Sequence, residues 1–158
     1  MSKRTFYEHF PDKEACFLAS YLACTERVLN AITSAVDPRA PWRSQVRAAM
    51  QAYLSQLQSK AALTQTFFLE IQAAGPQAMK VRQDVYQRFN DTIRGLVAQM
   101  RQLNPDLQEL SPSMATAVVG GINALVLLAA ETGRADQLLA LEDTATELLC
   151  ALLERRPV

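Results

Sequence analysis

The stretch "SKRTFYEHFPDKEACFLASY", residues 2–21, puts cations, hydroxyl groups and aromatic rings into one short turn that leads into a helix start. Ser2 is suited to cap a short helix over residues 3–10, with Phe6 and Phe10 turned inward. The outward side then carries hydrogen-bond donors and cations, the groups that contact phosphate oxygens and base edges in nucleic acids. These residues are Ser2, Lys3, Arg4, Thr5, Tyr7 and His9.

Lys13 adds a further cation where the next helix begins. Asp12 is a plausible N-cap, and a helix N-terminus exposes backbone N–H groups that favour an anion. Lys13 is therefore a seventh candidate for a phosphate contact.

The size and charge of the chain restrict these possibilities. With 158 residues, of which 49% are hydrophobic, the chain is long enough for one domain with a real core. Its 16 basic and 16 acidic side chains cancel, so any nucleic-acid binding must come from a local patch. We find no signal-peptide pattern, and the three cysteines lack metal-ligand spacing, so we expect a reduced cytoplasmic protein without a metal site.

Nearly all of the chain is predicted to be helical, because apolar residues recur at three- and four-residue spacing and no alternating strand pattern occurs. Pro41 fits a first helical position, Gly75-Pro76 closes one helix, and Ser111-Pro112 reads as an N-cap followed by a first-turn proline. We expect helices over 12–36, from Pro41 through Leu57, and over 61–73, 77–103, 112–132 and 135–155.

The stretch 114–130 has only Thr116 and Asn123 as polar side chains. A membrane span needs about 20 apolar residues. This run is shorter, so we expect a helix buried by protein rather than a membrane segment.

The last helix shows a coiled-coil-like seam, and together with 112–132 it holds more apolar surface than a monomer would hide. We therefore expect a homodimer joined by a four-helix bundle, two helices from each chain. The alternative, that both helices fill a monomer core, is less favoured because few other helices are left to cover them. The predicted interface comprises Val118, Gly121, Ile122, Leu125, Leu138, Leu141, Ala145, Leu148 and Leu152.

The opening stretch resembles the recognition helix and following helix start of TetR-family transcriptional regulators. The matching residues are Thr5, Phe6, Tyr7 and Phe10, then Lys13-Glu14-Ala15 and Phe17-Leu18. The resemblance implies an all-α, TetR-like fold, with residues 1–11 as a remnant of the helix-turn-helix and 12–158 as a ligand-binding and dimerisation domain. It also implies that Lys3, Arg4 and Thr5 contact bases and flanking phosphates, while Tyr7, His9 and Lys13 contact the DNA backbone.

The sequence departs from the family pattern at its beginning. The family places the first two helices of the helix-turn-helix before the position of Ser2, and the sequence begins at Met1. We therefore expect a shortened regulator that binds operator DNA only when those helices are present. The alternative is a DNA-silent, dimeric protein that binds a small molecule.

The resemblance also implies a small-molecule pocket, here within 41–103 and on one side of the helix after Ser111. Aromatic and Met side chains with a few polar groups suit an apolar or aromatic effector, although a plain core shows the same spacing. Glu70 would suit a cationic ligand only if it turned inward. The predicted lining comprises Met50, Tyr53, Phe67, Phe68, Met79, Tyr86, Phe89, Met100 and Asn123.

The sequence does not suggest an enzyme or a cofactor. Its one His lies in the opening turn, and no cysteine has a nearby base, no carboxylates cluster, and no Gly-rich phosphate loop occurs. A thiol-based redox regulator acting through Cys16, Cys24 or Cys150 is a further alternative. Buried cysteines that behave as small apolar residues are the simpler reading.

Overall fold

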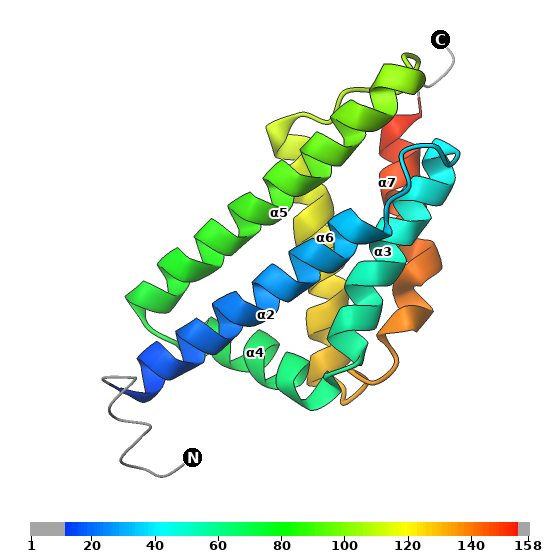
Figure 1. The fold of residues 1–158 in the computed structure, drawn as a ribbon. Coiled ribbons are helices and arrows are strands. Elements are labelled where there is room, and N and C mark those ends of the chain that lie inside the picture. The colour runs from blue at the N-terminus through cyan, green and yellow to red at the C-terminus, as the bar shows by residue number, and fades with distance from the viewer. Residues whose placement is uncertain (1–11, 155–158) are drawn as a thin grey trace.

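Residues 12–154 are described by the computed structural model, and they contain six α-helices, one short 3-10 helix and no strand (Figure 1). The predicted all-α class is therefore confirmed. The predicted helix over residues 3–10 lies outside the described residues. In chain order the elements are α2 (Lys13–Ala35), α3 (Trp42–Gln58), α4 (Ala61–Ala73), α5 (Pro76–Leu103), α6 (Pro112–Glu131), η1 (Leu138–Leu141) and α7 (Glu142–Leu153).

Capping side chains start two helices where the sequence predicts them. The Ala15 N–H donates a 2.7 Å hydrogen bond to Asp12, and the Met114 N–H donates one of 3.2 Å to Ser111. The prediction for Pro41 is wrong by one position, because Pro41 is the N-cap of α3. Its φ of −52° suits a helix, but its ψ of 139° is extended.

The predicted single helix over 135–155 is also wrong. Gly133 ends α6 with a φ of +70°, and the chain then forms η1 before α7 begins at Glu142. The Leu139 N–H donates to the Gln58 side chain at 2.8 Å, so this bond is unavailable to a continuous helix. Glu142 and Asp143 occupy the first turn of α7, where acidic side chains complement the helix dipole.

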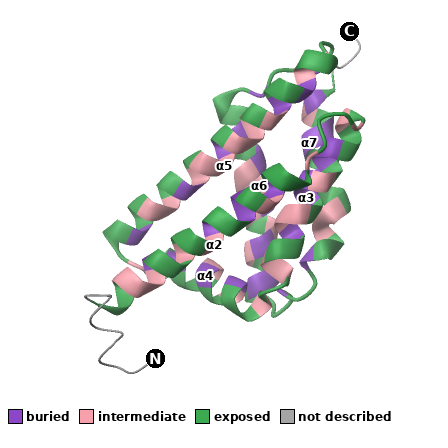
Figure 2. Cartoon of the chain, viewed as in Figure 1, coloured by how far each residue is buried: buried purple, intermediate pink, exposed green. Residues whose placement is uncertain are grey.

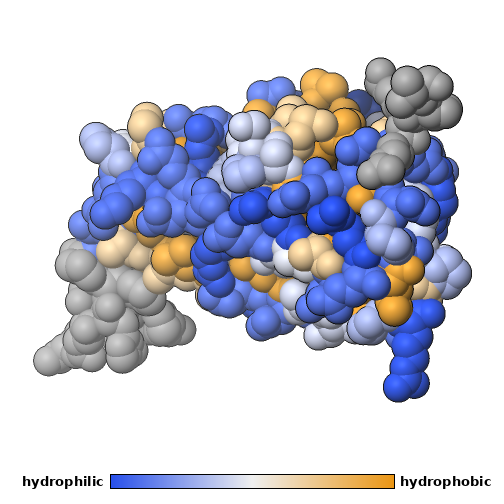
Figure 3. All heavy atoms as spheres, turned by 90° about the horizontal axis from the view of Figure 1, so that it is seen from above, coloured by the Kyte–Doolittle hydropathy of each residue, from blue (hydrophilic) through white to orange (hydrophobic). Residues whose placement is uncertain are grey.

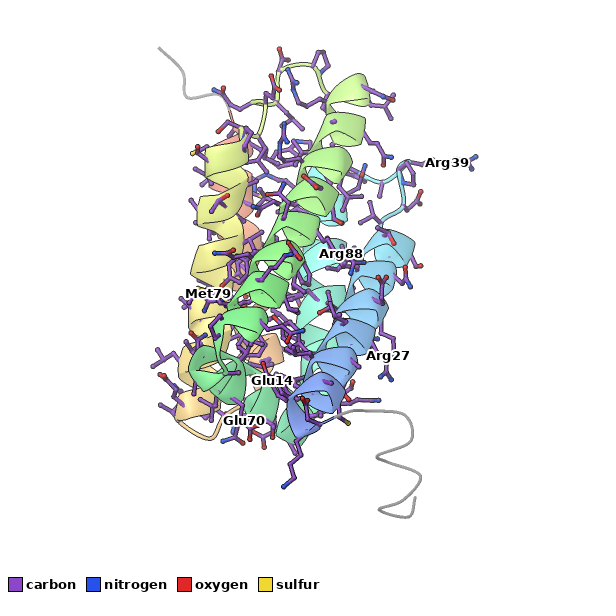
Figure 4. The ribbon with its side chains drawn as sticks, turned by 90° about the vertical axis from the view of Figure 1, so that its left-hand side faces the viewer. Glu14, Arg27, Arg39, Glu70, Met79 and Arg88 are labelled. Carbon is purple, nitrogen blue, oxygen red and sulfur yellow. The ribbon has the colours of Figure 1, made fainter. Side chains whose placement is uncertain are left out.

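The helices pack as a bundle in which α2 and α5 lie side by side and α7 lies along α3 (Figure 1). The main core joins α3, α5, α6 and α7, and Val46, Val97, Val118 and Leu149 form its centre. At the surface, Arg88 of α5 pairs with Glu26 of α2, as the position of Arg88 between these helices in Figure 4 illustrates.

Burial follows one face of each helix, and the colours of Figure 2 show this alternation along the ribbon. On α2 the inner face holds Leu18, Val28, Leu29 and Ile32, whereas Leu22 is 37% exposed. The end view in Figure 3 shows separate apolar groups on a largely hydrophilic surface.

The apolar helix α6 is covered on one face only. Ala115, Val118, Ile122 and Val126 are buried, whereas Met114 and Leu128 are exposed, Leu128 to 52%. By length and composition α6 is long and apolar enough to cross a membrane, a test that core helices also pass. The expected burial on all sides is therefore not achieved within this chain.

Candidate ligand-binding cavity

A cavity of about 150 Å³ lies inside the bundle, with walls from α2, α3, α4, α5 and α6 and with Leu149 of α7 at one point. From α2 it is lined by Tyr21, Thr25, Val28 and Ile32, which follow one another at four- and three-residue spacing on one face of the helix. The cavity thus lies directly against α2, the helix that begins within the opening stretch.

The predicted pocket residues lie on this wall with a single exception. Met79, which Figure 4 labels, is 57% exposed and lies outside the cavity, whereas its neighbour Ala78 is fully buried in the first turn of α5. Glu70 is also exposed and does not line the cavity, so the condition for a cationic ligand is not met. The lining includes the other predicted residues, Met50, Tyr53, Phe67, Phe68, Tyr86, Phe89, Met100 and Asn123.

Aromatic rings give the cavity its shape. The ring centroids of Tyr53 and Phe89 are 5.8 Å apart, and those of Tyr21 and Phe67 are 5.7 Å apart, both edge to face. Edge-to-face pairs add stabilisation beyond buried area. They therefore hold the walls of α2, α3, α4 and α5 in a defined arrangement around the empty space.

The polar groups of the wall are few and mostly neutral. Asn123 Nδ2 donates a 2.5 Å hydrogen bond to the Tyr86 hydroxyl, and the Thr25 and Thr64 hydroxyls donate to backbone carbonyls of Tyr21 and Leu57. Burial raises the pKa of Tyr21 to about 12 and also raises the pKa of Tyr53, so both phenols are uncharged at neutral pH.

Sequence reasoning missed the contribution of α2, because it placed the pocket between residues 41 and 103. Tyr21, Thr25 and Val28 line the cavity together with Met50 and Ile122. Thr25 was a usable signal, since it is a buried polar residue within an apolar helical stripe. Spacing alone does not distinguish a side chain that borders a void from one that fills the core.

The residues predicted to contact DNA are almost all outside the described part of the chain. Ser2, Lys3, Arg4, Thr5, Tyr7 and His9 fall before residue 12, and only Lys13 is described. Lys13 is the exposed first residue of α2. It therefore stands at the junction between the opening stretch and the cavity wall.

The predicted dimer residues divide into two groups. Val118, Ile122, Leu138 and Ala145 are buried in the core of this chain. The bend at η1 and the packing of α6 against α5 turn them inward. The second group keeps some solvent exposure, so a partner could contact it. It comprises Gly121, Leu125, Leu141, Leu148 and Leu152.

The cysteines differ in their surroundings. Cys150 is buried in the main core, and burial raises the pKa of its thiol, which lowers its reactivity. Cys24 is half-buried beside the cavity, and Arg27 Nη2 lies 3.7 Å from its sulfur. Among residues 12–154, no three His, Cys, Asp or Glu side chains form a group that could hold a metal ion.

The fold matches a solved structure described as a bacterial regulatory protein in the TetR family from Rhodococcus RHA1. The TM-score is 0.71 at 17% sequence identity, and the match covers 99% of this chain and 82% of that chain. The sequence matches no protein-family model and no curated protein. The match establishes the fold, so the predicted TetR-like architecture is confirmed.

Proposed function

We propose that the chain is the effector-binding and dimerisation part of a TetR-like transcriptional regulator, a cytoplasmic repressor that an apolar or aromatic small molecule releases from DNA. One observation carries this proposal: the internal cavity is walled in part by α2. Tyr21, Thr25 and Val28 face the empty space, and α2 begins at Lys13, within the stretch that resembles a TetR recognition helix and the helix start after it.

The proposed mechanism is a shift between two arrangements of the helices. A ligand that fits the cavity better when α2 is tilted favours that arrangement by its difference in affinity. A 100-fold difference corresponds to about 2.8 kcal/mol. Two reading heads must sit about 34–36 Å apart to enter successive major grooves, so a small tilt of each α2 weakens operator binding.

A second copy of the chain is the proposed partner on α6. We define the α6 seam as Met114, Ala117, Gly121, Ala124 and Leu128, whose steps alternate between three and four residues. Gly121 is half-buried and the other four are exposed, so a continuous apolar strip lies on the surface. This spacing is typical of helices that pack along one another, and the small residues permit close approach. Leu148 of α7 borders the strip beside Gly121.

The test begins with DNA fragments selected from a random pool by the protein with its natural N-terminal sequence. We expect the selected DNA to contain a palindromic site. We also expect apolar compounds that bind the cavity to release the protein from this DNA. Ala49→Phe fills the cavity from α3 and should abolish release while DNA binding remains. Ala62→Phe on the exposed side of α4 is the matched control. A protein that selects no DNA is not a regulator of this class.

The same DNA tests the role of Lys13. Lys13→Ala should weaken binding to all sequences and reduce the slope of log affinity against log salt by about 1. Lys80→Ala, which removes an exposed lysine from α5, should leave both quantities unchanged. An unchanged salt slope in Lys13→Ala would exclude a phosphate contact.

A further inference from the structure

A small chamber of about 20 Å³ adjoins the main cavity between α2, α4, α5 and α6. Tyr21, Phe68, Tyr86 and Asn123 line both spaces, so the chamber lies directly against the larger void, and we call it the side pocket. This volume exceeds the roughly 10–15 Å³ that one water needs, so the chamber suits a small polar group of a ligand. The remaining walls are formed by Ile71, Gln72 and Arg82.

Hydrogen-bond donors converge on this chamber. Arg82 Nη1 donates to Gln72 Oε1 at 2.8 Å, and the guanidinium carbon lies 5.9 Å from the centre of the Tyr86 ring. Because the Tyr86 oxygen accepts from Asn123, its own O–H is left to donate elsewhere. The side pocket thus presents a guanidinium and a phenol O–H to whatever occupies it.

All charged side chains that line the cavity and the side pocket are cations, and neither wall includes an Asp or Glu. The other ionisable groups in the walls are tyrosine phenols and one cysteine thiol. Within residues 12–154, Arg82 forms no ion pair, unlike Arg43, Arg47 and Arg88. The whole chain carries 16 basic and 16 acidic side chains, so this excess is local to the cavity.

We propose that the chamber at Arg82 binds the carboxylate of an aromatic acid whose apolar body occupies the main cavity. This rests on the proposed effector function and specifies the ligand class. A buried carboxylate requires a cation and hydrogen-bond donors, and Arg82 with the Tyr86 O–H supplies both. An organic cation in the same position would be repelled by the Arg82 guanidinium, because no Asp or Glu lines the pocket to balance its charge.

Two other cations border the main cavity at a different place. Arg27 and Lys60 are exposed, and Figure 4 shows Arg27 on the outer side of α2. Charges at the surface are screened by salt and water. Arg82 is half-buried and lies beside the aromatic wall, so it is the cation that an enclosed carboxylate meets.

The experiment compares two probes with one body, 2-naphthoate and 2-naphthylmethanol, by isothermal titration calorimetry. We expect the wild-type protein to bind the acid about tenfold or more tightly than the alcohol. Arg82→Gln should remove this preference by weakening the acid alone, and Arg82→Lys should retain part of it because the charge remains. Lys80→Gln removes an exposed cation from the same helix and should leave the preference intact.

Each other outcome overturns the inference. Equal affinity for acid and alcohol excludes a carboxylate site but leaves an effector cavity in place, provided that Ala49→Phe abolishes binding. If the preference for the acid is lost in Arg27→Gln or Lys60→Gln but kept in Arg82→Gln, the carboxylate binds beside Arg27 or Lys60 and not in the side pocket at Arg82. Failure of both probes to bind the wild-type protein contradicts the proposed ligand class, and the effector function then stands or falls on the DNA-release experiment. Thermal unfolding confirms that each variant is folded.

Discussion

Asn123 of α6 donates a 2.5 Å hydrogen bond to the hydroxyl oxygen of Tyr86 of α5. The two residues lie 37 positions apart in the sequence, and both line the main cavity and its side pocket. The bond therefore joins the helix of the proposed dimer surface to the helix that carries Arg82. It leaves the Tyr86 O–H free to act as a donor within the side pocket.

A double-mutant cycle measures this contact. Asn123→Ala and Tyr86→Phe each remove one partner, and we expect a coupling free energy of about 1 kcal/mol, as for a partly buried hydrogen bond. Urea unfolding of the wild type, both single variants and the double variant provides the four values. Additive effects of the two substitutions would mean that the bond does not stabilise the fold.

Leu138 and Leu139 are neighbours that differ in burial. Leu138 is fully buried with Leu54 and Val126, whereas Leu139 is 36% exposed. Leu138→Ala should lower the free energy of unfolding by about 2–5 kcal/mol, since it leaves a cavity in the core. Leu139→Ala should change it by less than about 0.5 kcal/mol. Equal losses at a fixed protein concentration would contradict the placement of Leu138 inside the protomer.

The α6 seam makes a prediction about oligomeric state. Leu128→Lys puts a charge into the C-terminal end of the α6 seam, and we expect the dimer dissociation constant to rise by about tenfold or more. Sedimentation equilibrium measures it, and Leu103→Lys, which changes a 73% exposed leucine at the end of α5, should have no effect. A wild-type protein that is monomeric at all concentrations would exclude this interface.

The buried phenol of Tyr21 predicts a loss of stability in alkaline solution. Burial raises its pKa to about 12, against about 10 in the unfolded chain. Between these values the unfolded state releases a proton that the folded state keeps, so the free energy of unfolding falls as pH rises. Below about pH 10 this contribution is fully present.

Tyr21→Phe removes this titration and should flatten the decline in stability between pH 10 and pH 11. Tyr53 remains in the variant, and burial raises its pKa as well, so a smaller decline should persist. Urea unfolding of both proteins at pH 8, 10 and 11 provides the comparison. The same decline in wild type and variant would show that Tyr21 keeps an ordinary pKa in the folded protein.

Local signals in the sequence predicted most helix bounds. Asp12 and Ser111 cap α2 and α6 through hydrogen bonds to nearby N–H groups, and Gly75-Pro76 separates α4 from α5. Such interactions span only a few residues, so they can be read directly from the chain. Where the local signal was ambiguous, at Pro41 and between Gly133 and Glu142, the predicted bounds were wrong.

The sequence alone determined that this chain is a set of amphipathic helices with one unusually apolar member, because periodicity and capping depend on neighbours along the chain. Tertiary structure decided which apolar positions are core, cavity wall or surface. Leu138 is buried, Tyr21 borders a void and Leu128 remains exposed, although all three are apolar or aromatic residues at helical spacing. The side pocket at Arg82 likewise exists only because residues from four helices meet there. Distances across a bundle depend on how the helices pack, and no local pattern contains that information.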